Sequence, residues 1–272
     1  MIKSVFMRPQ ALLGIGIITT MLLIAIMAPV ISPNDPNEIN ILHVYEEPSA
    51  KFILGTDEMG RCVFSRLLYG ARNSLFVAIP TLLLLAIIST CISSVCTYAG
   101  GWVDRSFVML SDMLMAFPPL LVAVTLVGSF GQSYFSIVLS IVVSMWVWFA
   151  KVVRTLVLVE KKKPYILSCR IAGCRNNNII FCHIIPNILP RLLVYFSTGI
   201  SSIIITISGY AFLGLGFPAG TAEWGAMFRK GVSYLYSHPR LLVWPGICIL
   251  VTTAGFNLFG EALRDTISPR EG

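Results

Sequence analysis

Charged residues are scarce in this sequence. They account for 12% of its 272 residues, while hydrophobic residues account for 56%; a soluble domain usually carries about 25% charged residues. The apolar residues also lie in long runs, and a run of about 20 such residues crosses the hydrocarbon core of a bilayer as a helix. The scarcity of charge therefore excludes an ordinary soluble domain and indicates an integral membrane protein.

Two further features are missing. Of the seven cysteines, only Cys62 falls in a segment expected outside the cell, which excludes a disulfide framework there. The sequence also lacks a Gly-x-x-x-x-Gly-Lys-Ser/Thr phosphate loop, so we expect no ATPase site and no enzyme activity in this chain. Neither internal repeats nor low-complexity tracts divide it, and a single domain over residues 1–272 is the simplest interpretation.

Six apolar runs predict an all-α membrane domain with six transmembrane helices. The expected spans are 11–31, 74–99, 106–128, 134–158, 189–212 and 241–259. The long segments between them are the outer loops 32–73 and 214–240 and the cytoplasmic loop 159–188. The first run also has the basic start of a signal peptide, but its length and the lack of a cleavage site favour a retained span.

The net charge of +7 is explained by this topology. With an even number of spans and both termini in the cytoplasm, most of the 20 Lys and Arg residues lie on the cytoplasmic side, among them Lys3, the run 161–163 and Arg270. Acidic and basic residues balance on the outer side. The positive-inside rule favours this orientation, and the basic excess gives no reason to expect binding to nucleic acid.

The cytoplasmic loop has the most informative pattern. Residues 165–172 predict a short helix, and Gly173 permits a turn with positive φ. Residues 176–185 predict a second short helix, which we expect to end at Pro186 and Pro190. Two short helices joined at a glycine would form a knob that fits a groove on a soluble partner. A plain loop in contact with water and lipid alone is the alternative.

Several motifs then resemble one family. Gly173, followed after nine residues by His183-Ile184-Ile185-Pro186, resembles the coupling loop of bacterial ATP-binding-cassette importer permeases, in the dipeptide, oligopeptide and nickel branch. Other segments that resemble this branch are 54–61, 65–75, 100–105, 212–216, 223–227 and 256–265. The order and spacing of these motifs carry the resemblance, which extends over nearly the whole chain.

The resemblance implies a type I importer permease with six transmembrane helices in the bacterial cytoplasmic membrane. The partners implied are a homologous second permease, two cytoplasmic ATP-binding subunits, an extracytoplasmic substrate-binding protein and membrane lipid. The partner subunits would use ATP, and this chain would bind no cofactor. The residues implied in coupling to the ATPase are Ile171, Ala172, Gly173, Cys174, Arg175, His183 and Pro186.

The sequence departs from the family pattern in two places. The family has Glu-Ala-Ala where this chain has Leu167, Ser168 and Cys169, so an acid that could pair with the ATPase is missing, and docking is expected through the apolar tip 171–174. The outer motif of the family ends in an aspartate where this chain has Cys62.

Two pairs of outer residues invite a functional and a structural interpretation. Arg61 and Arg66 precede the second span, and Glu223 and Trp224 lie in the last outer loop. We expect these four residues to contact the binding protein. Anchoring at the membrane interface, with the long side-chain stems in lipid, is the alternative.

The nature of the cargo is less sharply indicated. Segments 146–154, 221–225 and 244–246 resemble nickel permeases more than peptide permeases, and short outer loops suit a small cargo. Nickel or a nickel chelate is therefore favoured over dipeptides or oligopeptides. A secondary transporter or a channel subunit is a more distant alternative.

Residues that could meet a cation lie in the third run. Met109, Asp112 and Met113 share a helical face at i, i+3 and i+4, and their thioether and carboxylate groups could pass a borderline-soft cation. The alternatives are methionines that fill the core and an Asp112 that makes a structural hydrogen bond. The group formed by Cys169, Cys174, Cys182 and His183 fits no zinc spacing, and we expect no firm metal site.

Overall fold

The computed structural model describes residues 8–267; Lys3 and Arg270, whose charges entered the topology argument, lie outside the described residues. Within this range the chain is helical and forms no strand, which confirms the all-α class. The long helices are α2 (Pro9–Ile31), α3 (Val63–Ala99), α6 (Tyr134–Glu160), α9 (Ile185–Phe212) and α11 (Arg240–Ile267). The shorter ones are η1 (Ile41–His43), α4 (Gly101–Met115), α5 (Pro119–Phe130), α7 (Pro164–Ile171), α8 (Asn176–Asn178), the π-helical turn η2 (Ile179–Ile184) and α10 (Trp224–Ser233).

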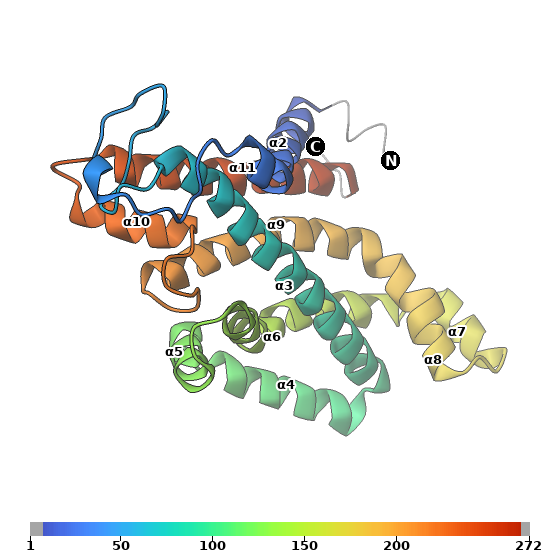
Figure 1. Ribbon diagram of the computed structural model, residues 1–272. Helices are drawn as coiled ribbons and strands as arrows, with labels where there is room; N and C mark the ends of the chain where they lie inside the picture. Colours follow the sequence, from blue (N-terminus) through green and yellow to red (C-terminus); the bar gives the residue numbers. More distant parts are fainter. Residues whose placement is uncertain (1–7, 268–272) are drawn as a thin grey trace.

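Helix α3 crosses the middle of the molecule and packs against α2, α6 and α9 (Figure 1). The core lies where these helices meet, around the fully buried Leu85, Ile141 and Ile203. At one end of the bundle, residues 32–62 and 213–239 gather around α10 into what we call the outer lobe, after the outer loops predicted there (Figure 1). At the opposite end, residues 164–184 project as the coupling knob.

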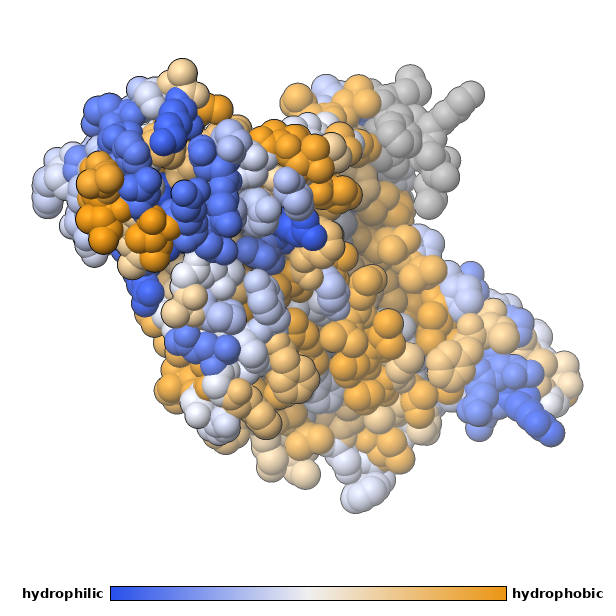
Figure 2. Space-filling model, viewed as in Figure 1, coloured by the Kyte–Doolittle hydropathy of each residue, from blue (hydrophilic) through white to orange (hydrophobic). Residues whose placement is uncertain are grey.

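The surface polarity follows this arrangement. In Figure 2, hydrophobic residues cover the middle of the molecule, while hydrophilic residues concentrate on the outer lobe and at the coupling knob. Large apolar side chains such as Leu23, Ile87 and Leu250 are exposed on the spanning helices. A bilayer solvates such side chains, so the exposed apolar band supports the reading of the long helices as membrane spans. Among residues 8–267, five helices have the length and hydropathy of a membrane span, and the number is six if one bent pair of helices is counted as a single span.

The third predicted span differs from the structure. The run 106–128 was expected to be one helix, but α4 and α5 are separate and bent by 80° relative to each other. The physical reason is Pro118-Pro119: neither residue has an N–H to donate, and proline disfavours helical backbone in the residue before it. Helix α4 accordingly ends at Met115, and Pro119 becomes the first residue of α5.

The second span begins earlier than predicted, and the second helix of the cytoplasmic loop continues past its predicted end. Helix α3 starts at Val63, whereas the predicted span was 74–99. The predicted stop at Pro186 is also wrong, because the helical segment runs without a break from Asn176 to Phe212. Proline at residue 186 is tolerated in the first turn of α9 because the preceding η2 turn is π-helical, and this wider winding accommodates a missing N–H. Pro190 lies inside α9.

Helices α2 and α11 approach closely through two glycines. A Cβ atom added at Gly14 would lie 2.7 Å from the backbone N of Phe259, and one added at Gly255 would lie 2.6 Å from Cγ2 of Ile17. Small residues at such a crossing let two helices pack backbone to backbone, which is a main source of attraction between helices in lipid.

We expect Gly14→Val to lower the free energy of unfolding by about 1–3 kcal/mol, because the added side chain must push α2 away from α11. The measurement is thermal or denaturant-induced unfolding of the purified chain in detergent. Gly16→Val is the matched control, since it lies on the same helix and has nothing within 4 Å of its Cβ position. Equal stability of the two variants would contradict the proposed role of the glycine contact.

Candidate functional site

The coupling knob is built as a helix with a defined end. Helix α7 stops at a turn in which the N–H of Gly173 donates to the carbonyl of Arg170 and the N–H of Cys174 donates to the carbonyl of Cys169, both at 3.0 Å. This pair of bonds defines a Schellman motif, and it requires positive φ at the glycine, which has φ 77°. The short helix and glycine turn expected from the sequence are thus confirmed.

Side-chain hydrogen bonds fasten the knob to the membrane helices. The hydroxyl of Tyr165 donates to Glu160 at 2.7 Å and accepts from Asn187 Nδ2 at 3.1 Å, which ties α7 to α6 and α9. Arg170 Nε donates to the hydroxyl of Tyr98 at the end of α3, at 3.2 Å. Burial, followed by the hydrogen bond to Glu160, raises the pKa of Tyr165 to about 12. The tyrosine therefore stays protonated and keeps its donor at neutral pH.

The tip of the knob is free to meet a partner. Residues 171–175 are all exposed, and the side chain of Ile171 keeps 79% of its surface accessible. His183 is half-buried on the η2 turn and Pro186 is exposed at the start of α9. The structure thus brings the predicted tip residues together, with His183 and Pro186 on the neighbouring helical segment rather than at the tip itself.

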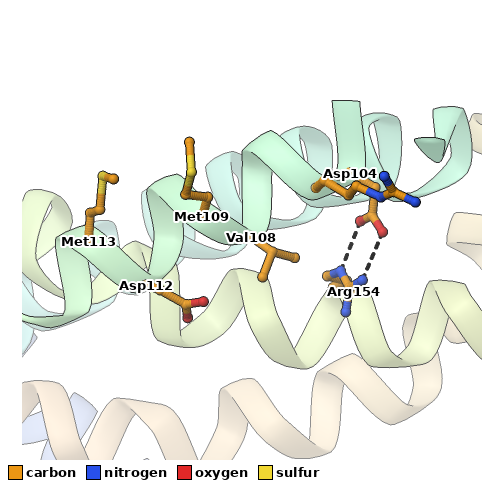
Figure 3. A pocket seen from close by; sticks show the side chains of 7 residues that line it. Asp104, Val108, Met109, Asp112, Met113 and Arg154 are labelled. Atoms are coloured by element: carbon orange, nitrogen blue, oxygen red, sulfur yellow. Dashed lines mark hydrogen bonds and ion pairs between the residues drawn. The ribbon is translucent and has the colours of Figure 1, made fainter. Parts of the chain in front are cut away.

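The predicted cation-passing face lines an open cavity of about 610 Å³ on the side of α4 (Figure 3). Met109 and Met113 point away from Asp112 in Figure 3, so the three side chains do not converge on one point. Asp112 accepts a hydrogen bond from Lys151 Nζ of α6 at 2.6 Å. Asp112 therefore makes the structural hydrogen bond that was the alternative interpretation, within an ion pair.

A second ion pair clamps α4 to α6 at the same cavity. Arg154 donates to both oxygens of Asp104, from Nε at 2.8 Å and from Nη2 at 2.7 Å (Figure 3). Bidentate pairs of this kind are among the stronger polar contacts in proteins. Residues 8–267 contain no group of three or more His, Cys, Asp or Glu side chains that could hold a metal ion. The wall of the cavity thus carries charged side chains of both signs, Asp104 and Asp112 with Arg105 and Arg154.

The four predicted contact residues of the outer lobe are buried. Arg61 and Arg66 each retain 3% of their surface, and Glu223 and Trp224 retain none. This contradicts the exposed position that both sequence-based interpretations required. The reason is pairing within the chain: Arg61 pairs with nearby acids, whereas Arg66, Glu223 and Trp224 bind distant segments.

The arginines join the start of α3 to the loop before it. Arg61 donates from Nε to Asp57 at 2.8 Å and from Nη2 to Glu58 at 3.1 Å. Arg66 donates from Nη1 to the carbonyl of Pro36 at 2.8 Å. Glu58 also binds Lys230 of α10, which extends the network across the lobe. Sequence reasoning missed Asp57, Glu58 and Lys230; the spacing of Asp57 and Arg61 at i and i+4 was the available signal.

Glu223 and Trp224 fix α10 against α3. Trp224 Nε1 donates to the carbonyl of Leu67 at 3.1 Å, and its ring lies over Gly70, where a Cβ atom would come within 2.5 Å of Cδ1. Glu223 is the N-cap of α10, accepting from the N–H of Ala226 at 2.9 Å and from the hydroxyl of Ser74 at 3.1 Å. Burial raises the pKa of Glu223 to about 6, against the opposing effect of these hydrogen bonds.

Comparison with known proteins gives a consistent assignment. Residues 82–271 match the family described as binding-protein-dependent transport system inner membrane component, and residues 2–48 match the N-terminal TM domain of oligopeptide transport permease C. A nickel transport system permease protein of Escherichia coli is 34% identical, over 94% of this chain and 93% of that protein.

Two peptide permeases are similar to the same degree. A dipeptide transport system permease protein of Alkalihalophilus pseudofirmus is 34% identical, over 98% of this chain and 88% of the relative. An oligopeptide transport system permease protein of Bacillus subtilis is 33% identical, over 96% of this chain and 85% of the relative. The identities do not separate nickel from peptide relatives.

The buried Glu223 predicts a pH dependence of stability. Because its pKa is about 6 in the folded chain and 4.5 is its ordinary value, the folded state binds a proton more readily than the unfolded state. The stabilisation from this proton is complete below the ordinary pKa and is lost as the pH rises through about 6. We expect the free energy of unfolding to gain about 1 kcal/mol from this group between pH 7 and pH 5.

Glu223→Gln should remove that gain while keeping a side-chain acceptor for the N–H of Ala226. The measurement is unfolding of both proteins in detergent across this pH range, with the difference between the two curves isolating Glu223 from other titrating groups. Parallel curves would show that the carboxyl group does not titrate in this window.

Proposed function

The chain belongs to the family of binding-protein-dependent transport system inner membrane components, and from this membership we propose that it forms half of the translocation pathway for nickel or a nickel chelate. It is an ABC importer permease of the nickel, dipeptide and oligopeptide branch, a multi-pass inner-membrane protein whose family works with ATPase and binding-protein partners. A homologous second permease would supply the other half, and two ATP-binding subunits would sit beneath the pair.

The observation that carries this proposal is the exposed tip of the coupling knob. The tip is presented by α7, which Tyr165 and Arg170 fasten to the ends of α3, α6 and α9. A force exerted on residues 171–175 is therefore transferred to the spanning helices instead of bending a loose loop. Such a tip suits an ATPase subunit whose movement has to reach the membrane, and ATP would be bound there and not in this chain.

The proposed orientation has both termini in the cytoplasm. Arg8 at the start of α2 donates to Asp265 near the end of α11 at 2.8 Å, so the described ends of the chain lie together. Both lie towards the end of the bundle that bears the coupling knob (Figure 1). The basic run 161–163 is at this end too, as the positive-inside rule requires of the cytoplasmic side.

Nickel is proposed over peptide on the strength of segments 146–154, 221–225 and 244–246. Peptide import is the second candidate, because the dipeptide permease is as similar to this chain as the nickel permease is. Both candidates assign the chain the same place in the transporter.

Gly173→Val should abolish ATP-dependent uptake and co-purification with the ATPase, because valine does not tolerate the φ of 77° that the tip requires. The measurement is uptake and co-purification in cells that carry the complete transporter. Gly131→Val is the matched control: Gly131 has φ 76° and, like Gly173, has nothing within 4 Å of its Cβ position, but it lies between α5 and α6. Unimpaired coupling in the Gly173 variant would refute docking through this tip.

The identity of the cargo can be tested by measuring uptake of radioactive nickel and of a labelled dipeptide. The cells compared contain all other transporter components and either have or lack this chain. We expect deletion of the chain to abolish nickel uptake and to leave dipeptide uptake at the level of the parent strain. Loss of dipeptide uptake alone would replace nickel by peptide while retaining the permease assignment.

A further inference from the structure

A small basic cavity opens in the outer lobe, where α9 ends and α10 begins. Its volume is about 210 Å³, and its walls come from the last turn of α9, the loop 214–221, α10 and the first turns of α3. Three basic side chains line it, Arg66, Arg229 and Lys230, and none of its described lining residues is acidic. The cavity is therefore suited to an anion and not to a cation.

The three cations differ in how far they are already neutralised. Lys230 binds Glu58, and Arg66 has Asp57 at 3.6 Å. Arg229 has no ion pair among residues 8–267. Arg229 thus has its donors available for a ligand.

Arg66 adds a buried guanidinium whose N–H donors are only partly used by hydrogen bonds within the chain. Only 3% of its surface is exposed, and it lines the cavity. Its bond to the carbonyl of Pro36 is short, at 2.8 Å, but its contacts with the carbonyls of Gly220 and Thr221 are long, at 3.4 and 3.5 Å. A buried guanidinium with such weak contacts gains from a further acceptor.

The loop leaves room for the guanidinium of Arg229. Gly214 has φ 81°, and a Cβ atom there would lie 2.5 Å from Nη1 of Arg229. Gln132 Nε2 donates to the carbonyl of Gly214 at 2.9 Å, which joins this loop to the segment between α5 and α6. The glycine thus makes room for the guanidinium of Arg229, an exposed residue of α10, at the junction of three elements.

We propose that this cavity receives a carboxylate group of the cargo as the cargo enters the translocation pathway. A guanidinium offers two parallel N–H donors that match the two oxygens of a carboxylate. A volume of about 210 Å³ is below that of pockets for drug-sized ligands, so an end group enters and not a whole ligand. The inference rests on the proposed function and sharpens it.

The same chemistry would serve either cargo class. A peptide brings its C-terminal carboxylate, and a metal chelate brings the carboxylates of its organic ligand. A bare divalent metal ion meets no acidic side chain among the described lining residues and is repelled by Arg229, whose charge has no ion-pair partner among residues 8–267. The cavity therefore favours nickel carried as a carboxylate chelate over nickel as the free ion.

Arg229→Gln tests this in proteoliposomes that hold the complete transporter with saturating binding protein. The cargoes are free nickel ion, nickel citrate, a dipeptide and the same dipeptide with its C-terminus amidated. We expect the variant to slow uptake of the carboxylate-bearing cargo about 10-fold, since a hydrogen bond to a charged group is lost, and Arg229→Lys to restore part of the rate. Whichever of nickel citrate and dipeptide is imported identifies the source of the carboxylate.

Arg72→Gln is the matched control. Arg72 also carries a positive charge on the first turns of α3, but it lies over the ring of Phe76 and does not line the cavity. Its loss should change uptake by less than about twofold, because this half-buried charge lies outside the cavity. Equal slowing of uptake by both variants would show that the loss of any positive surface charge has this effect, and would overturn the proposal.

A second measurement separates cargo from binding protein. In the complex without binding protein, phenylglyoxal should modify Arg229, and the dipeptide or nickel citrate should slow this modification while the amidated dipeptide should not. No protection, together with weaker capture of the binding protein by Arg229→Gln, would make Arg229 a docking contact and refute a cargo site. Import of none of the four cargoes by the unsubstituted complex would instead overturn the proposed function, whatever the modification experiment gives.

Discussion

A chain in hydrocarbon must satisfy its backbone hydrogen bonds within its own helices, because the solvent offers none. Every feature of functional interest in this protein lies where that condition is relaxed. The helical winding stops at Pro118-Pro119 between α4 and α5, widens in the η2 turn, and ends around Gly173 and Gly214. The spanning helices supply a frame, and the coupling knob and the basic cavity of the outer lobe lie at breaks in it.

Few polar contacts join the helices in the apolar band. Each one links a particular pair of helices at a fixed position along their length. Asp104 with Arg154 and Asp112 with Lys151 join α4 to α6. Deeper in the bundle, Ser93 donates to the carbonyl of Ala150 at 2.7 Å and Ser201 donates to the carbonyl of Thr253 at 3.0 Å. Such bonds contribute only about 0.6 kcal/mol each on average in membranes, so their main effect is to fix register, while close packing supplies most of the attraction.

Local features of the fold could be predicted from the sequence, and long-range ones could not. Hydropathy alone located the apolar runs, and Gly173 with its neighbours predicted a helix and a turn because both depend on adjacent residues. The two prolines at 118 and 119 were a local signal for the bend between α4 and α5. The prediction missed it because the residues on both sides are apolar and read as one continuous span. The pairing of Arg61 with Asp57 had a local signal in their i, i+4 spacing, but the burial of Glu223 and Trp224 had none. Ser74 and the carbonyl of Leu67, which satisfy Glu223 and Trp224, lie about 150 residues away in the chain.

The unbroken helical segment from Asn176 to Phe212 has a mechanical consequence. Its 37 residues follow a helical path about 55 Å long, which curves between α9 and α8 (Figure 1). One end carries the π-helical turn next to the coupling tip, and the other carries Ala211, which lines the basic cavity of the outer lobe. Tilting the whole segment by about 10° around its centre displaces its two ends by up to roughly 5 Å in opposite directions. A movement at the coupling knob can thus widen or narrow the basic cavity of the outer lobe.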